Sequence, residues 1–160
     1  MKTLVYVLAS GRSGSTLLDK FLNAHPRISG FGEIGRLPHV EDNGPNYCGC
    51  SLAINECDVW NPVLKEAQKK KDWGFEEWTS FLMEYLFTEN DFVVDSSGSL
   101  KRLKKLIALN SNSFSIKVIY LHRNPFGVIY SMNKKGKRVT GKKTSLFRAT
   151  VGWSLRNAKM

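Results

Sequence analysis

The sequence has no apolar stretch long enough to cross a bilayer, which takes about 20 residues of helix. We therefore expect no transmembrane segment. The apolar run from Thr3 to Ala9 is at the short limit for the core of a signal peptide, and cleavage there would destroy the glycine-rich loop that follows. A buried first strand explains this run better, and we expect a cytoplasmic protein.

Acidic residues are also few. The 160 residues contain 14 Asp and Glu against 24 Lys and Arg, which gives a formal net charge of +10. This charge favours anionic partners, such as nucleotides, nucleic acids, anionic membranes or acidic substrates, and says nothing about the fold. One basic run fits a solvated loop and a ligand-facing surface equally well; it consists of Lys134, Lys135, Lys137, Arg138, Lys142 and Lys143.

Cysteine is scarce, and its three residues, Cys48, Cys50 and Cys57, lie close together. With His39 as a fourth ligand, this spacing fits the start of a zinc site. A disulfide that leaves one thiol over also fits. Because no secretory signal precedes them, we favour reduced thiols in an irregular loop and expect no bound metal.

Short apolar runs alternate with amphipathic stretches along the chain. The runs predict buried strands over 3–9, 92–95 and 115–121. Helices are expected over 15–23, 59–71, 75–87 and 100–109, from 125 to about 133, and from about 145 to 159. Residues 27–57 are rich in Gly, Pro and Asn, and we expect them to be irregular.

This alternation predicts an α/β fold with a P-loop-type parallel sheet flanked by helices. We find no repeat, low-complexity tract or linker, so we expect one nucleotide-binding domain over 1–160. The last helical pattern ends without a cap, which we interpret as a sign of a C-terminally truncated chain or a fragment.

The stretch ASGRSGST, residues 9–16, lies between the first strand and the first helix, where a phosphate-binding loop would lie. Gly11 and Gly14 allow the backbone to close on an anion, and the helix N-terminus adds partial positive charge. Compared with the triphosphate pattern GxxxxGK[ST], Ser15 replaces the lysine, while Thr16 keeps the hydroxyl. Arg12 adds a planar charged group suited to a tetrahedral oxyanion. The loop therefore fits a shorter phosphate ester better than ATP hydrolysis.

A second candidate anion site follows the strand at 115–121. Arg123 comes at the strand end, and Ser131 lies eight residues later within the expected helix. Taken alone, a strand-end arginine is more often an ordinary surface charge.

Together the two motifs, GRSGSTLL and R-x7-S, resemble those of sulfotransferases that use 3′-phosphoadenosine 5′-phosphosulfate. The segment LLDKFLNAHPRISGFGEI is similar to the one that follows the loop in tyrosylprotein sulfotransferases and their bacterial relatives. CGC…CDVW is similar to an insert of the bacterial members, and with VVDSSGSLKRL the likeness covers most of the chain. The resemblance implies a 5′-phosphosulfate in the loop and a 3′-phosphate on the arginine–serine pair. The implied binding residues are Gly11, Arg12, Ser13, Gly14, Ser15, Thr16, Arg123 and Ser131.

The same resemblance implies that Glu33, in GFGEI, is the catalytic carboxylate that deprotonates the acceptor hydroxyl. Arg12 would neutralise charge on the sulfuryl group and the leaving phosphate, so no metal is needed. His25, His39 and His122 are alternative bases, of which His122 is the most credible, although we rank it below Glu33.

One position departs from the family pattern. Relatives often carry a lysine after Asp-Ser-Ser, which assists the leaving group, but this chain has Gly98 there. Lys101, one turn further on, is a candidate substitute. We expect Gly98→Lys to raise turnover.

Two other classes of function compete with this interpretation. A nucleotide kinase or triphosphatase would use Asp95, at the end of FVVD, to hold Mg²⁺. A basic nucleic-acid-binding module would rest on the net charge alone, and we do not expect a nucleic-acid partner. For a sulfotransferase the acceptor would be a small molecule, carbohydrate or peptide with a hydroxyl, bound by variable loops such as 36–60 or the basic run.

Overall fold

The computed structural model describes residues 1–35, 52–70, 72–110, 113–140 and 145–159. Within them, four parallel strands form one sheet in the order β2-β3-β1-β4. The strands are β1 (Thr3–Ala9), β2 (Ile28–Gly30), β3 (Phe92–Asp95) and β4 (Ser115–Leu121). Thr3 is in register with Phe92 on one side and Ser115 on the other. The predicted α/β class, with helices flanking a parallel sheet, is confirmed.

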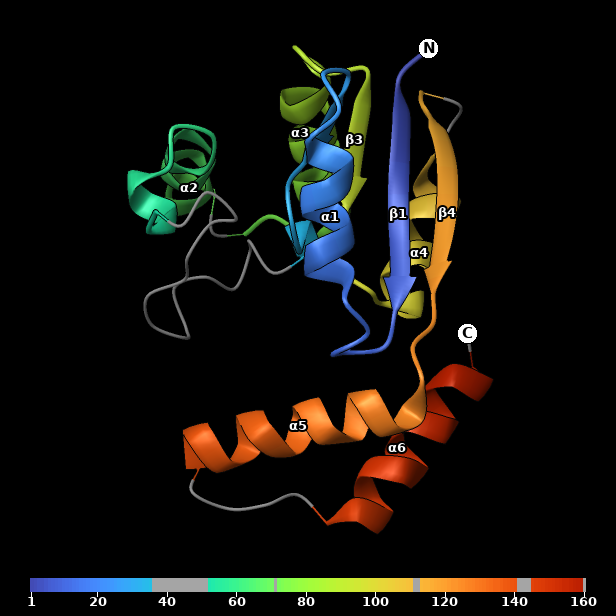
Figure 1. Ribbon diagram of the computed structural model, residues 1–160. Helices are drawn as coiled ribbons and strands as arrows, with labels where there is room; N and C mark the ends of the chain where they lie inside the picture. Colours follow the sequence, from blue (N-terminus) through green and yellow to red (C-terminus); the bar gives the residue numbers. More distant parts are fainter. Residues whose placement is uncertain (36–51, 71, 111–112, 141–144, 160) are drawn as a thin grey trace.

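The helices lie on both faces of the sheet and beyond one of its ends (Figure 1). α1 covers one face, α3 and α4 cover the other, and α5 and α6 lie beyond the carboxyl ends of β1 and β4 (Figure 1). The bounds are α1 (Ser15–Asn23), the 3-10 turn η2 (Ile54–Glu56), α2 (Trp60–Lys69), α3 (Phe75–Phe87), α4 (Leu100–Leu109), α5 (Pro125–Thr140) and α6 (Leu146–Ala158).

After Thr3, β1 is apolar, as expected for a strand whose two faces are both covered. Leu4, Tyr6 and Leu8 join the larger core with residues of α3 and α4. Val7 and Ala9 point the other way and pack with Val94 and, from α1, Leu18 and Leu22. This two-sided packing fixes the strand end from which the glycine-rich loop leaves.

Three sequence-based expectations were wrong in part. β2 is a strand within a segment expected to be irregular, and α5 continues to Thr140, through much of the basic run expected to lie beyond the helix. β4 was expected to be buried, but it is an edge strand of the sheet that the described residues form, and Val118 and Tyr120 are 47% and 46% exposed.

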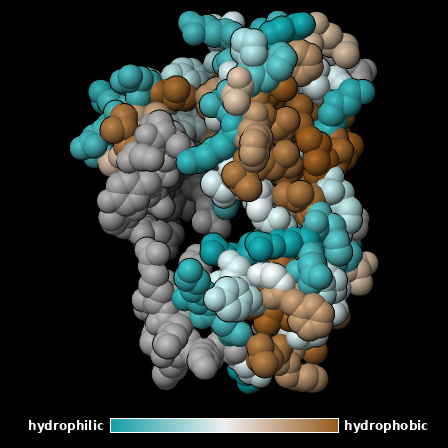
Figure 2. Space-filling view, viewed as in Figure 1, coloured by the Kyte–Doolittle hydropathy of each residue, from teal (hydrophilic) through white to brown (hydrophobic). Residues whose placement is uncertain are grey.

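Apolar side chains remain at the surface in two regions. Figure 2 shows them over β1 and β4 beside α1, and again over α5 and α6. Phe21 of α1, Phe126 and Tyr130 of α5, and Phe147 of α6 are all at least 70% exposed. In the described part of the chain, no helix is both long enough and apolar enough to span a membrane.

The cysteine cluster lies largely outside the described residues, which include neither Cys48 nor Cys50 nor His39. Cys57 is buried in the larger core.

Candidate active site

The loop after β1 has the backbone geometry of an anion-binding turn. Gly14, the residue before α1, has φ 104°, and Arg12 has φ 72°, a left-handed conformation that is uncommon outside glycine. The Ser13 amide donates to the Ser10 carbonyl at 3.2 Å, which closes the turn. A glycine in the capping position offers no side-chain acceptor to the first amides of α1, so these are available to an anion.

The Ser13 side chain is buried, and its hydroxyl shares a 2.8 Å hydrogen bond with that of Ser10. Ser15 is half-buried and Thr16 is exposed at the start of α1, where hydroxyls can face a ligand. A Cβ added at Gly11 would meet no other atom within 4 Å, so the loop is open around this position.

The structure brings the two sequence motifs together. Arg12 Nε donates to Ser131 Oγ at 2.9 Å, and Arg123 Nη1 donates to the Arg12 carbonyl at 3.2 Å. Because β1 and β4 are adjacent and parallel, their carboxyl ends meet at the same edge, where ligands of open α/β sheets bind. Two arginines therefore lie together at the end of the glycine-rich loop.

Arg123 is positioned by the start of α5. Asn124 caps this helix, since its Oδ1 accepts from the Phe126 amide at 2.9 Å, as the Asn-Pro sequence predicts. The Arg123 side chain passes over Gly127, where a Cβ would lie 2.9 Å from Nε. The absence of a side chain at 127 thus leaves room for the arginine.

Glu33 follows β2 and lines a pocket of about 660 Å³ beside the carboxyl ends of β2 and β3. Its backbone neighbours are anchored on both sides. The Gly32 amide donates to Asp19 Oδ2 at 3.2 Å, the Ser96 amide donates to the Gly32 carbonyl at 2.8 Å, and the Gly35 amide donates to Ser97 Oγ at 2.8 Å.

Asp19 is the least expected of these anchors, because it is a carboxylate buried on α1. Burial raises the pKa of its carboxyl group, while the hydrogen bonds from Gly32 and Ser96 act in the opposite direction. Asp19 thus links α1, the helix after the glycine-rich loop, to the segment that carries Glu33.

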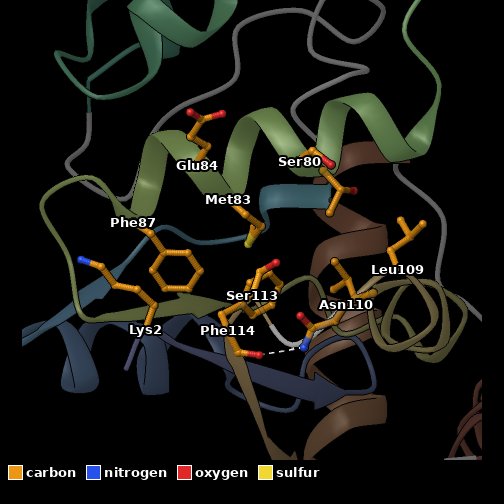
Figure 3. A pocket seen from close by; sticks show the side chains of 11 residues that line it. Lys2, Ser80, Met83, Glu84, Phe87, Leu109, Asn110, Ser113 and Phe114 are labelled. Atoms are coloured by element: carbon orange, nitrogen blue, oxygen red, sulfur yellow. Dashed lines mark hydrogen bonds between the residues drawn. The ribbon is translucent and has the colours of Figure 1, made fainter.

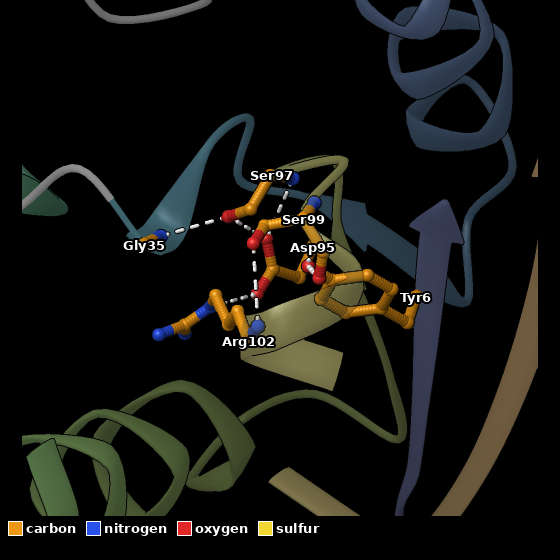
Figure 4. A network of polar contacts seen from close by, with 6 residues as sticks. All are labelled: Tyr6, Gly35, Asp95, Ser97, Ser99 and Arg102. Carbon is orange, nitrogen blue, oxygen red and sulfur yellow. Dashed lines mark hydrogen bonds and ion pairs between the residues drawn. The ribbon is translucent and has the colours of Figure 1, made fainter. Parts of the chain in front are cut away.

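A polar network surrounds the end of β3 (Figure 4). Arg102 Nε donates to Asp95 Oδ2 at 3.0 Å, and the other Asp95 oxygen accepts from the Ser97 amide at 2.9 Å and from the Ser97 hydroxyl. The Tyr6 hydroxyl donates to the Ser99 carbonyl at 2.8 Å, and burial raises the pKa of this phenol. Asp95 is fully buried and forms an ion pair with Arg102. This pairing weakens the assignment of Asp95 as a magnesium ligand.

Sequence reasoning missed Arg102. The sequence pattern that could have indicated this residue is a strand-end aspartate followed seven residues later by an arginine in the first turn of the next helix. A strand-end carboxylate is compatible with several kinds of partner, so this pattern alone does not predict the ion pair.

The backbone geometry at Gly98 argues against the expected benefit of a lysine there. Its φ is 71°, and a Cβ would lie 2.7 Å from the Ala9 carbonyl oxygen. Glycine therefore allows segment 95–99 to approach the end of β1 closely. Lys101, the suggested substitute, lines the same pocket as Glu33.

The sulfotransferase family model matches residues 5–159, nearly the whole chain. The chain belongs to the sulfotransferase family. Among curated proteins, none has a matching sequence.

Two solved sulfotransferase domains share the fold of this family member. The domain from the curacin biosynthetic pathway is 22% identical with a TM-score of 0.67, and the match covers 99% of this chain and 61% of that domain. The domain from the Synechococcus PCC 7002 olefin synthase is 21% identical with a TM-score of 0.62, covering 98% and 59%. The chain thus spans about three-fifths of the length of either domain.

The Pnkp1/Rnl/Hen1 RNA repair complex is also similar in fold. A chain of this complex is 12% identical with a TM-score of 0.53, and the match covers 99% of this chain and 46% of that one.

Two of the three histidines of this sulfotransferase-family chain lie within the described residues. His25 follows α1, and its Nδ1 accepts from the Arg27 amide at 3.2 Å. His122 follows β4 and is exposed, with its ring between Tyr120 and Trp153 at 6.2 and 5.3 Å. His39 lies outside the described residues.

A second pocket, of about 350 Å³, lies at the opposite end of the sheet (Figure 3). Lys2 precedes β1 and Phe114 precedes β4, so this pocket is at the amino ends of the strands. The Asn110 side chain bridges to the Phe114 carbonyl at 2.7 Å beside it. Its distance from the glycine-rich loop sets it apart from the candidate active site.

Proposed function

We propose that this protein transfers the sulfuryl group of 3′-phosphoadenosine 5′-phosphosulfate to an acceptor hydroxyl. The observation that carries the proposal is the meeting of Arg12, Arg123 and Ser131 at the carboxyl edge of the sheet. A donor with phosphate groups at the 3′ and 5′ positions of its ribose needs two anion sites close together, and the two arginines at this edge support such an arrangement.

The described residues fit such a donor. The loop amides, with the Ser15 and Thr16 hydroxyls, bind the 5′-phosphosulfate, as at other helix N-termini. Arg123 and Ser131 bind the 3′-phosphate. Arg12 lies between the two groups, because its side chain contacts Ser131 while its backbone belongs to the loop.

In the reaction, the acceptor oxygen attacks sulfur in line while the bond from sulfur to the 5′-phosphate oxygen breaks. Glu33 takes the proton of the acceptor hydroxyl. The products are a sulfate ester and adenosine 3′,5′-bisphosphate. Arg12 and the loop amides neutralise the charge that grows on the leaving phosphate, the kind of preorganised electrostatic contribution that is often the largest in catalysis.

Calorimetry with two nucleotides tests the donor site. Arg123→Met should weaken binding of adenosine 3′,5′-bisphosphate by roughly 10- to 100-fold, the value of a hydrogen bond to a charged group. The affinity for adenosine 5′-monophosphate should not change, since this ligand lacks the 3′-phosphate. Arg148→Met, at an exposed arginine of α6, is the matched control and should leave both affinities unchanged.

Equal losses for the two nucleotides would contradict the assignment of Arg123, and tighter binding of Mg-ATP than of the bisphosphate would favour a kinase. For catalysis, Glu33→Gln should lower kcat for sulfuryl transfer at least 100-fold with bisphosphate affinity unchanged. An unchanged kcat would exclude Glu33 as the base.

A further inference from the structure

The pocket that holds Glu33 has a lining of unusual composition. Its volume, about 660 Å³, is in the range of small-molecule sites. Around Glu33 it combines aromatic rings from the segment before α3 and from α3 itself with cations from the start of α4. The rings are Trp73, Phe75 and Trp78, and the cations are Lys101, Arg102 and Lys105.

The positive charge at this pocket is only partly compensated. Lys101 and Lys105 are four residues apart on α4, hence on one face of the helix, and both are exposed. In the described part of the chain neither forms an ion pair. Arg102 is paired with Asp95 through Nε, but its Nη2 is buried without a hydrogen-bond partner among the described residues.

Helix stability does not explain these cations. The first turn of α4 carries Lys101 and Arg102 and no acidic residue, although the positive end of a helix dipole disfavours cations. The dipole instead adds to the positive potential in the pocket.

Aromatic rings hold the cations at the pocket wall. Lys105 Nζ lies 4.7 Å from the centre of the Phe75 ring, and Arg102 Cζ lies 5.6 Å from it. Such contacts orient a cation without neutralising it as a carboxylate would. Trp73 and Trp78 pack edge to face at 5.5 Å and add apolar surface to the same wall.

We propose that this pocket binds an anionic acceptor: a hydroxyl compound with an aromatic or apolar body and a carboxylate. The carboxylate lies against Lys101 and Lys105, the body contacts the tryptophans, and the hydroxyl points to Glu33. The inference rests on the proposed sulfuryl transfer, and it adds the chemical class of the acceptor.

Three phenols that share a 4-hydroxyphenylethyl body but differ in charge test this selectivity. The probes are 3-(4-hydroxyphenyl)propionate, its neutral primary amide, and the cation 4-hydroxyphenethylamine. Calorimetry at low salt, without any donor, should show the acid binding at least tenfold more tightly than the amide, and the amine binding most weakly. A neutral probe that binds as tightly as the acid would overturn the proposal.

Lysine variants localise the effect. Lys101→Met and Lys105→Met should each reduce the acid-to-amide affinity ratio several-fold. Lys104→Met is the matched control, because Lys104 is an exposed lysine of the same helix that does not line the pocket, and its ratio should stay unchanged. An equal effect of Lys104→Met would mean that the general positive field, and not the pocket, selects the anion, which would overturn the proposal.

Because binding is measured without donor, this test is separate from that of sulfuryl transfer. Charge-selective binding with no transfer from the phosphosulfate donor would refute the proposed function and leave the pocket's selectivity standing. Sulfuryl transfer that is equally fast to the acid and to the amide would support the proposed function and refute the charge selectivity of the pocket.

Discussion

Arg12 Nε donates a 2.9 Å hydrogen bond to Ser131 Oγ across 119 residues of sequence. Because the two side chains are in contact, their contributions to the binding of a shared ligand should be coupled. In a double-mutant cycle on affinity for adenosine 3′,5′-bisphosphate, Arg12→Met and Ser131→Ala should show an interaction energy of about 0.5–3 kcal/mol. Calorimetry measures it.

The control pairs Arg12→Met with Thr150→Ala, which removes an exposed hydroxyl on α6. Those two changes should be additive. Additivity of Arg12→Met with Ser131→Ala as well would mean that the two motifs act on different ligands.

Gly127→Ala should displace Arg123, because the new Cβ would lie 2.9 Å from its Nε. We expect bisphosphate affinity to fall several-fold while Tm stays level or rises, since alanine favours a helix over glycine by about 1 kcal/mol. Calorimetry and thermal unfolding measure the two effects. Gly152→Ala in α6 is the control, because its Cβ would be 3.7 Å or more from other atoms and affinity should not change. A loss of affinity that merely follows a loss of Tm would contradict the positioning role.

Gly98 should tolerate no side chain. Gly98→Ala combines a left-handed backbone with a 2.7 Å approach to the Ala9 carbonyl, whereas Gly32→Ala, at φ 69°, meets no atom within 4 Å. Gly32→Ala should therefore cost only the conformational strain, about 1–2 kcal/mol, and Gly98→Ala clearly more.

Chemical denaturation measures the free energy of unfolding of the two alanine variants.

Because a side chain at position 98 would meet the Ala9 carbonyl, we expect Gly98→Lys to lower the rate of sulfuryl transfer and not to raise it. A stable Gly98→Lys protein with faster turnover would show that segment 95–99 adapts to a side chain.

Asp95→Asn should reduce the free energy of unfolding by about 3–5 kcal/mol, because Arg102 would keep a largely buried charge without its partner. Asp91→Asn breaks the Lys2–Asp91 pair, whose side chains are 39% and 58% exposed, and should cost less than about 1 kcal/mol. Urea unfolding gives both values. Similar losses in the free energy of unfolding for the two variants would argue against a structural role of the Asp95–Arg102 ion pair.

Asp19 should make stability depend on pH. Because burial raises its pKa, the folded protein binds this proton up to a higher pH than the unfolded chain does. Stability relative to the Asp19→Asn variant should therefore fall as pH rises from about 4, the ordinary value, through the raised pKa. Urea unfolding of both proteins between pH 4 and 7 measures the difference. If the stability relative to Asp19→Asn rose with pH instead, the pKa of the Asp19 carboxyl group in the folded protein would lie below its usual value.

Most of the fold followed from local pattern. β1, with its apolar run ended by Ser-Gly, and α3, with its helical spacing of aromatics, have the predicted bounds because both are buried against several elements. β2 has three residues, too few for a period-two pattern, and its pairing with β3 depends on the rest of the sheet. The end of α5 was misplaced because the helix was expected to end at about Asn133, before the basic run, although lysine and arginine are good helix formers.

The site was predictable to the extent that its motifs are contiguous. The loop at 9–16 and the pair Arg123 and Ser131 were found from spacing and resemblance, and their approach follows from β1 and β4 being neighbours. The ion pair of Asp95 with Arg102, the carboxylate of Asp19 and the cationic pocket depend on which elements pack together. No single segment encodes that packing.

Segment 95–99 touches both halves of the site: Gly98 lies against the last residue of β1, and Ser97 and Ser99 line the pocket of Glu33. A ligand that shifts this segment from one side changes the free energy of binding on the other, and such coupling is reciprocal. The donor product and the acceptor should therefore alter each other's affinity by one and the same factor.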